Sequence, residues 1–216
     1  MTTMNAIIKT ASISDPVERG IAAYLDEIIE LRHDLHQYPE LAFQEHRTAK
    51  KVAALLGDWG YEVTTGIAGT GVVATLRRGD GNRSIGIRAD MDALPIEEAT
   101  GLDYASSNPG VMHACGHDGH TSILLAAARY LAESGSFSGT LRLIFQPAEE
   151  IGAGARKMLS EGLFDRFPVD AVFGLHNWPG VPAGQFGFVA GPAMASVDKA
   201  VIRIVGKGGH GAEPHR

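Results

Sequence analysis

The chain has 216 residues, of which 44% are hydrophobic and 20% are charged, a balance typical of a globular protein with a sizeable core. Its formal net charge of −6 excludes the basic surface that nucleic acid or an anionic membrane requires, so we expect neither partner. A single cysteine excludes an internal disulfide and is typical of the cytoplasm, where we expect the protein to reside. The sequence has neither a secretory signal nor an apolar run of about 18 residues, the length of a membrane-spanning helix.

The first part of the chain predicts two helices. Ser14 or Asp15 can cap the first, Pro16 fits its first turn, and Pro39 ends it. Apolar residues recur at helical spacing through this stretch. A second helix is predicted within residues 43–60, with its apolar residues on one face.

From residue 61 onward, short β-branched runs bounded by glycine or aspartate replace the helical pattern, which predicts strands. The predicted order is strands at 61–65, 71–78 and 84–90, a helix at 120–134, a strand at 140–145, a helix at 152–164 and a strand at 170–176. This alternation predicts an α/β fold with a mainly parallel sheet flanked by helices.

The composition changes again after Trp178, where glycine and proline become frequent. We place a domain boundary near residues 187–196, so that residues 1–190 belong to a first domain and residues 191–216 begin a smaller α+β domain. The second domain opens with a predicted strand that meets a glycine-rich turn. Because a lone strand cannot bury its own face, either this domain is completed elsewhere or the chain is a fragment.

Polar side chains stand at the ends of three predicted strands. Asp90 and Asp92 close the first of these strands, Glu149 and Glu150 follow the second, and His176 ends the third. Ligands of open α/β sheets bind at the carboxyl ends of the strands. We therefore expect these side chains to converge at one edge of the sheet.

The stretch VMHACGHDGH, residues 111–120, holds three histidines, one aspartate and the only cysteine of the chain. Cys115 and His117 are two residues apart, so in an extended segment they point to the same side. Thiolate, imidazole and carboxylate ligands together suit zinc, manganese, cobalt or nickel. Several carboxylates this close would repel one another without a cation. The pattern predicts a metal site, and a bridging thiolate or carboxylate allows two ions.

Each cluster taken alone also has a simpler structural explanation. A lone cysteine more often serves as a small buried hydrophobe, and Glu149 and Glu150 can begin a helix. Asp90 and Asp92 can end a strand in a turn, and His176 fits a core histidine as well as a ligand. The histidines of the first two helices are expected at the surface or in support of the site: His33, His36 and His46.

Five segments in chain order, RADMDALP, HACGHDGH, PAEE, GLHNWP and GKGGHGAEPH, resemble the aminoacylase branch of the co-catalytic metallopeptidases. That branch includes hippurate hydrolases, N-acyl-L-amino-acid amidohydrolases and plant indole-acetyl-amino-acid hydrolases. The segment RHDLHQYPELAFQEHRT resembles the opening helices of the same family, so the resemblance runs from about residue 18 to the last residue. It implies a catalytic domain followed by a lid or dimerisation domain, and metal-dependent hydrolysis of hippurate-like or N-acetyl amino acids.

The resemblance also implies a metal-ligand set for two divalent ions, which can be manganese, zinc, cobalt or nickel. Cys115 corresponds to the ligand that both ions share. His117, Glu150 and His176 correspond to further protein ligands. The cysteine between two histidines is thereby implied to be a metal-bridging thiolate.

Further residues correspond to the catalytic groups of the family. Glu149 corresponds to the general base that takes a proton from water and passes it to the leaving amine. Asp92, with Asp90 beside it, lies where the family keeps an acid that orients a metal ligand. His210 corresponds to a lid-domain histidine that reaches the active site of the partner subunit in a homodimer and polarises the substrate carbonyl.

Two alternatives accompany this interpretation. Members of the family continue beyond the last residue of this chain and supply a last histidine ligand, so we expect a C-terminally truncated chain with an incomplete site. The first alternative is therefore a metal-binding remnant without turnover. The second is a cysteine hydrolase that uses Cys115 with His117 or His113, in which case the nearby glutamates and His176 have no role. Such a thiol enzyme would survive a chelator.

Overall fold

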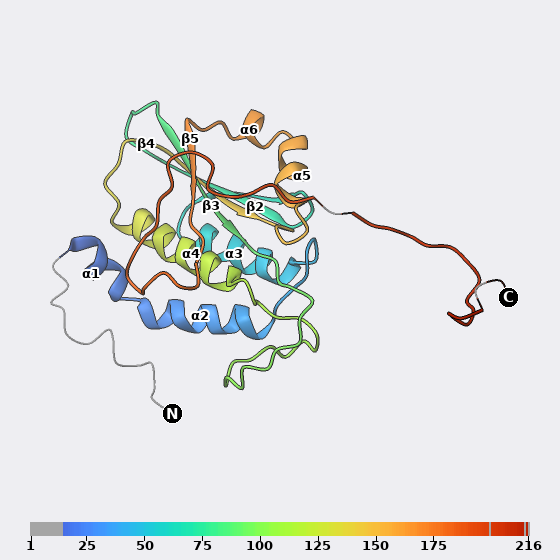
Figure 1. The fold of residues 1–216 in the computed structure, drawn as a ribbon. Helices are drawn as coiled ribbons and strands as arrows, with labels where there is room; N and C mark the ends of the chain where they lie inside the picture. Colours follow the sequence, from blue (N-terminus) through green and yellow to red (C-terminus); the bar gives the residue numbers. More distant parts are fainter. Residues whose placement is uncertain (1–14, 199, 214, 216) are drawn as a thin grey trace. The chain divides into compact units, whose positions relative to one another are not determined.

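The computed structural model describes residues 15–198, 200–213 and 215 (Figure 1). The chain divides into two units, one that ends at Asn177 and one that begins at Trp178. The domain boundary expected near residues 187–196 stays a prediction. The elements of the first unit are α1 (Pro16–Ala22), α2 (Leu25–Gln37), α3 (His46–Asp58), β1 (Glu62–Ile67), β2 (Gly71–Arg78), β3 (Ser84–Asp90), α4 (His117–Glu133), β4 (Gly139–Gln146), α5 (Gly154–Ser160), α6 (Leu163–Arg166) and β5 (Ala171–Gly174).

The first predicted helix forms two helices, α1 and α2, which are separated at Ala23 and Tyr24. Asp15 caps α1 as expected, because its Oδ1 accepts the Val17 N–H at 2.6 Å. The alternative cap, Ser14, lies outside the described residues. Tyr24 is buried and its hydroxyl donates to the Ala126 carbonyl at 2.9 Å. The break between the helices therefore buries Tyr24 against α4.

The sheet has the strand order β1-β2-β4-β3-β5 and is mixed. The pairs β1–β2 and β2–β4 are antiparallel, whereas β3 pairs in parallel with both β4 and β5. The α/β class is confirmed: in this mixed sheet β1, β3, β4 and β5 run in one direction and β2 runs opposite to them. The connections agree with these directions, because a tight turn joins β1 to β2 as an antiparallel hairpin, while the long segment with α4 between β3 and β4 permits a parallel crossover.

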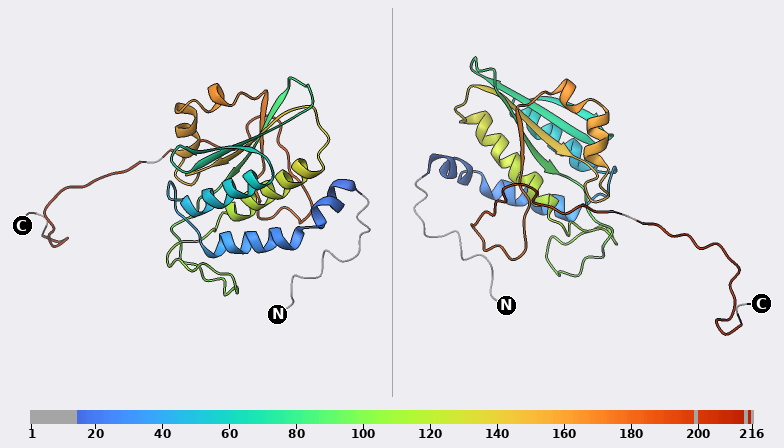
Figure 2. Two further views of the ribbon diagram at one scale, coloured as in Figure 1. Left: turned by 180° about the vertical axis from the view of Figure 1, so that it is seen from behind. Right: turned by 45° about the horizontal axis from the view of Figure 1, so that its top comes forward.

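Helices cover both faces of the sheet (Figure 1), and the views in Figure 2 agree that α3 and α4 lie on one face and α5 and α6 on the other. In β2, Val72 and Ala74 join the core beneath α3 and α4, whereas Val73 joins the smaller core beneath α5 and α6. This alternation follows from the two-residue period of a strand. Helix α2 packs on the outer side of α4. The segments that follow the strand ends are thus attached to a sheet with a hydrophobic core on each face.

Strand β5 differs from the other strands because all four of its residues are exposed. It lies at one edge of the sheet and pairs with β3 through Ala171 to Gly174. Val172 and Phe173 keep 45% and 58% of their surface accessible. Two residues after β5 comes His176, so this weakly covered strand carries one of the predicted metal ligands.

The unit from Trp178 onward contains no helix or strand among its described residues. The strand with which the second domain was expected to begin is therefore absent from the residues that the structure describes there. A strand needs a hydrogen-bonding neighbour, and the apolar side chains in this stretch remain exposed, with Val197 at 92% and Ile204 at 91%. Across both units, none of the helices described combines the length and apolar character needed to cross a membrane.

Candidate metal centre

The strand ends bring the predicted polar side chains together. Asp90 is the last residue of β3, Glu149 and Glu150 lie in the turn after β4, and His176 follows β5. Since β3, β4 and β5 are mutually parallel, their carboxyl ends lie at one edge of the sheet. The convergence expected from the sequence is therefore present.

Cys115 and His117 reach this edge through a turn rather than an extended segment. Gly116 has φ +84° and is the N-cap residue of α4, which begins at His117, three residues earlier than the sequence predicts. A Cβ at Gly116 would also lie 2.8 Å from Oδ1 of Asn177. Both the left-handed backbone and the close approach require glycine here. The expected proximity of the two side chains is correct, but its cause is this turn.

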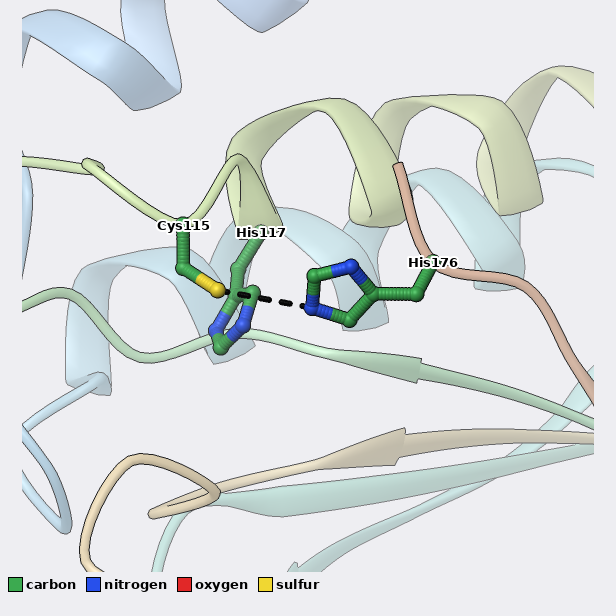
Figure 3. Close-up of side chains that lie close together, drawn as sticks. All are labelled: Cys115, His117 and His176. Atoms are coloured by element: carbon green, nitrogen blue, oxygen red, sulfur yellow. Dashed lines mark hydrogen bonds between the residues drawn. The ribbon is translucent and has the colours of Figure 1, made fainter. Parts of the chain in front are cut away.

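Cys115, His117 and His176 form a compact donor set (Figure 3). Their ligand atoms all lie within 4.8 Å of one another, and Sγ of Cys115 is 3.4 Å from Nε2 of His176. In each histidine Nδ1 donates to a backbone carbonyl, Asp92 O at 2.8 Å and Asn177 O at 2.5 Å. Such bonds fix the ring and its tautomer, so that Nε2 carries the lone pair needed by a metal.

Carboxylates complete this donor set around His117. Its Nε2 is buried without a hydrogen-bond partner and lies 3.6 Å from Asp90 Oδ2, 3.7 Å from Glu150 Oε1 and 3.8 Å from Glu149 Oε2. Oε1 of Glu150 is likewise buried without a partner. These gaps are long for hydrogen bonds, whereas ligands about 2 Å from one zinc ion lie roughly 3–4 Å apart. The residues present therefore fit a divalent metal.

The pKa of the Cys115 thiol bears on whether this residue acts as a nucleophile. Burial, together with the carboxylates of Glu150, Glu149 and Asp90, raises the pKa of the Cys115 thiol to about 12. Nucleophilic cysteines have a lowered pKa because cationic neighbours stabilise their thiolate. Burial also raises the pKa of Glu150. These surroundings disfavour the thiolate that a cysteine nucleophile needs, and a bound cation would be required to stabilise it.

Asp92 organises the site through its backbone and its side chain. Oδ1 accepts the Glu149 N–H and Oδ2 accepts the Glu150 N–H, both at 3.0 Å. Its carbonyl accepts Nδ1 of His117. One buried residue thus orients three groups of the candidate site, which is the type of role that the resemblance implies for it.

Asp90 is held by His120, a residue to which the sequence motif assigns no role. Nδ1 of His120 donates to Asp90 Oδ1 at 2.7 Å, and Arg88 pairs with Asp90 Oδ2 at 2.6 Å. Burial raises the pKa of Asp90, but the hydrogen bond from His120 and the charges of His117 and Arg88 outweigh it and lower the pKa to about 2. The spacing of His117 and His120 is one helical turn, so a helix starting at His117 would have revealed their shared face.

The three helix histidines differ in environment. His46 is exposed, and His33 stacks on Tyr104 with ring centroids 3.6 Å apart. His36 is buried, with Nδ1 at 2.9 Å from Asp118 and Nε2 at 3.2 Å from Glu98. A surface position for His36 is therefore wrong, and it supports the start of α4 through Asp118, the neighbour of His117.

His210 belongs to the second unit. Its Nδ1 accepts the Ala212 N–H at 3.2 Å. The structure describes each unit by itself, so the role of His210 at the candidate metal centre stays a prediction.

Comparisons with known proteins agree with this geometry. The profile of peptidase family M20/M25/M40 matches residues 86–213. The chain is 51% identical over 190 residues to a hippurate hydrolase of Campylobacter jejuni, which covers 88% of this chain and 49% of that protein. It is 44% identical to an N-acyl-L-amino acid amidohydrolase of Geobacillus stearothermophilus, covering 94% of this chain and 55% of that protein.

A solved structure from Bacillus subtilis, described as a dinuclear metal-binding peptidase from the M20 family, has the same fold. It matches with a TM-score of 0.70 and 45% identity over 74% of this chain and 45% of that chain. The chain spans about half the length of the curated relatives it matches. Because the family profile covers more than half of the residues and these relatives cover most of the chain, the chain belongs to peptidase family M20/M25/M40.

Proposed function

We propose that the protein is a metal-dependent amidohydrolase that cleaves the amide bond of N-acyl amino acids, with hippurate-like or N-acetyl compounds as substrates. The observation that carries the proposal is the donor set of Cys115, His117 and His176 within 4.8 Å. The names of relatives that are 44–51% identical support the reaction class. The dinuclear relative supports two divalent ions per site.

The proposed mechanism divides labour between the two adjacent glutamates. Bound divalent ions lower the pKa of a coordinated water and polarise a carbonyl. Glu150, with its side chain 16% exposed, would hold a metal, whereas Glu149, at 40%, remains accessible to water. Glu149 accepts the proton of the attacking water and transfers it to the departing amine nitrogen. Asp92 keeps both backbone amides of the pair in place during this transfer.

The remaining assignments extend the same proposal. His210 would polarise the substrate carbonyl from the partner subunit of a homodimer, and the ions would be manganese, zinc, cobalt or nickel. We propose the cytoplasm as the location, because a single cysteine at a metal site suits a reducing compartment.

The first test is the metal content of the purified 216-residue chain beside a Cys115→Ser variant, measured by mass spectrometry. We expect close to two divalent ions in the parent and clear loss in the variant, because Cys115 would supply one of the ligands that hold them. A Ser122→Ala variant is the matched control, since its hydroxyl bonds only to the Asp118 carbonyl within α4. Hydrolysis of hippurate and N-acetyl amino acids is then assayed with added manganese or zinc and with a chelator. Metal-free parent protein would contradict the proposal.

A second candidate function is metal binding without turnover. It rests on the donor set of Cys115, His117 and His176 alone, which fits a divalent ion whether or not an amide bond is cleaved. Two bound ions with no hydrolysis of any N-acyl amino acid would select this candidate. Hydrolysis that persists after complete removal of metal would contradict both candidates and favour a cysteine hydrolase that uses Cys115.

A further inference from the structure

We propose that Glu45, which precedes α3 and lies far from the site in the sequence, is a positioning residue for the turn that carries Glu149 and Glu150. The proposal rests on the function proposed above for those two glutamates. It concerns how the chain itself fixes the turn, which consists of residues 147–150.

Glu45 is fully buried, and its carboxylate has three hydrogen bonds. Oε1 accepts the Ala148 N–H at 2.8 Å and the Phe43 N–H at 3.0 Å, while Oε2 accepts the Thr70 hydroxyl at 2.5 Å. A buried carboxylate is costly unless it is fully hydrogen-bonded. The three groups that donate to Glu45 offset this cost: two backbone N–H groups and the hydroxyl of Thr70.

Both N–H groups on Oε1 belong to residues with a strained backbone. Phe43 has φ +62° and Ala148 has φ +51°, a left-handed conformation that non-glycine residues rarely adopt. Such conformations persist only where the surroundings determine them. Oε1 of Glu45 accepts the N–H group of both residues, so Glu45 stabilises this conformation at Phe43 and at Ala148.

Glu45 and Asp92 together hold three consecutive amides. The Ala148 N–H donates to Glu45, and the Glu149 and Glu150 N–H groups donate to the two oxygens of Asp92. The turn after β4 is therefore fixed by carboxylates from two other segments of the chain. A displacement of about 1 Å at a catalytic group can lower a rate by about 100-fold. By holding the turn in place, Glu45 would keep Glu149 and Glu150 in the positions that the reaction requires.

Helix capping does not explain Glu45. It is the N-cap residue of α3, yet its side chain makes no capping hydrogen bond. Glu40 does this instead, because its two oxygens accept the Arg47 and Thr48 N–H groups at 2.9 Å. Glu40 thus offers a matched control: a carboxylate at the same helix start whose side-chain bonds do not reach the 147–150 turn.

The test compares Glu45→Asp, Glu45→Gln and Glu40→Asp in the full chain. Aspartate keeps the charge but is one methylene too short to reach Ala148, whereas glutamine keeps the length and an acceptor oxygen. Hydrogen exchange of the amides at 148–150 is measured without metal, and Co²⁺ is titrated by its absorption spectrum. For Glu45→Asp we expect about tenfold faster exchange and about tenfold weaker Co²⁺ binding, with an altered d–d spectrum. Glu45→Gln should remain close to the parent, and Glu40→Asp should change exchange only at Arg47 and Thr48.

The proposal is overturned if Glu45→Asp exchanges at 148–150 like Glu40→Asp, or if glutamine is as damaging there as aspartate. If Glu45→Asp does not fold, Thr70→Val replaces only the hydroxyl that donates to the carboxylate by a methyl group of similar size. It should speed exchange at 148–150 about threefold, and unchanged exchange would overturn the proposal. A parent that binds no Co²⁺ contradicts the proposed function, while the exchange comparison still decides the role of Glu45.

Discussion

His36 lies between the carboxylates of Asp118 and Glu98, and this position makes stability depend on pH. The hydrogen bond to Asp118 raises the pKa of His36 above its usual value, although burial opposes the shift. Arg32 pairs with the same carboxylate of Asp118, and His113 lies beside the His36 ring. Because the pKa is higher in the folded than in the unfolded protein, the stabilisation is complete below the unfolded value of about 6.5 and is lost above the folded one.

We therefore expect the free energy of unfolding to fall as the pH rises from 6 to 9, and His36→Asn to lose this part of the slope. Urea unfolding of both proteins at several pH values measures it. His46→Asn is the control, since His46 is exposed. An unchanged slope in His36→Asn would contradict the prediction.

Glu149 is the residue for which the proposed mechanism makes the sharpest prediction. Glutamine at this position keeps the shape of the side chain and the backbone bond to Asp92 but cannot accept a proton. We expect Glu149→Gln to lower turnover of an N-acyl amino acid about 100- to 10,000-fold with an unchanged metal content. Loss of metal together with activity would instead assign Glu149 to the ligand set.

Residues with a recognisable local motif could be predicted from the sequence, and residues with distant partners could not. Cys115 and His117 stand in a dense motif, and the donor set of the structure contains both. Glu45 accepts a hydrogen bond from Ala148, which is 103 residues away in the sequence, and no local sequence pattern predicts such a pair. The position of His120 beside His117 could have been predicted, because both residues lie on one face of a helix that begins at His117.

The turn between β4 and α5 is the element on which the site depends most. At Gly154 a Cβ would lie 1.6 Å from the Pro147 carbonyl oxygen, while the Gly154 N–H donates to the Ala148 carbonyl at 3.0 Å. Alanine there must displace the turn. We expect Gly154→Ala to destabilise the protein by about 1–3 kcal/mol and to weaken metal binding, measured by thermal unfolding and titration.

Gly57 is the matched control because a Cβ there meets nothing within 4 Å. Near the end of α3, Gly57→Ala should stabilise the protein by about 0.5–1 kcal/mol through helix propensity. If both alanine variants behaved alike, the close contact at Gly154 would not constrain the turn.

Element types were predictable where the hydrophobic period was clear, as for α3 and β2 to β4. Element limits were less so, because they depend on tertiary contacts. Burial of Tyr24 divides the first helix, and Gly116 starts α4 earlier than its apolar pattern indicates. The reversed direction of β2 follows from its short connection to β1, which the alternation of strands and helices did not reveal.

The whole molecule consists of a buried core and an exposed C-terminal unit, each described separately. Every described residue from Trp178 onward is exposed. We expect trypsin to cut first after Arg203 and Lys207, and the remaining fragment to keep its metal, because Cys115, His117 and His176 all precede Trp178. Limited proteolysis with mass spectrometry identifies the sites. A first cut between Arg47 and Arg166 would contradict this order.

The exposed edge strand β5 gives metal binding a consequence for the fold itself. Cys115 and His117 stand at the start of the buried helix α4, whereas His176 follows a strand with no buried residue. An ion bound by all three residues would link β5, which has no buried residue, to α4, in which nine residues are buried. Fraying of β5 and release of the ion then become one thermodynamically linked event. Chelation should therefore loosen β5 before any other strand, and added metal should tighten it.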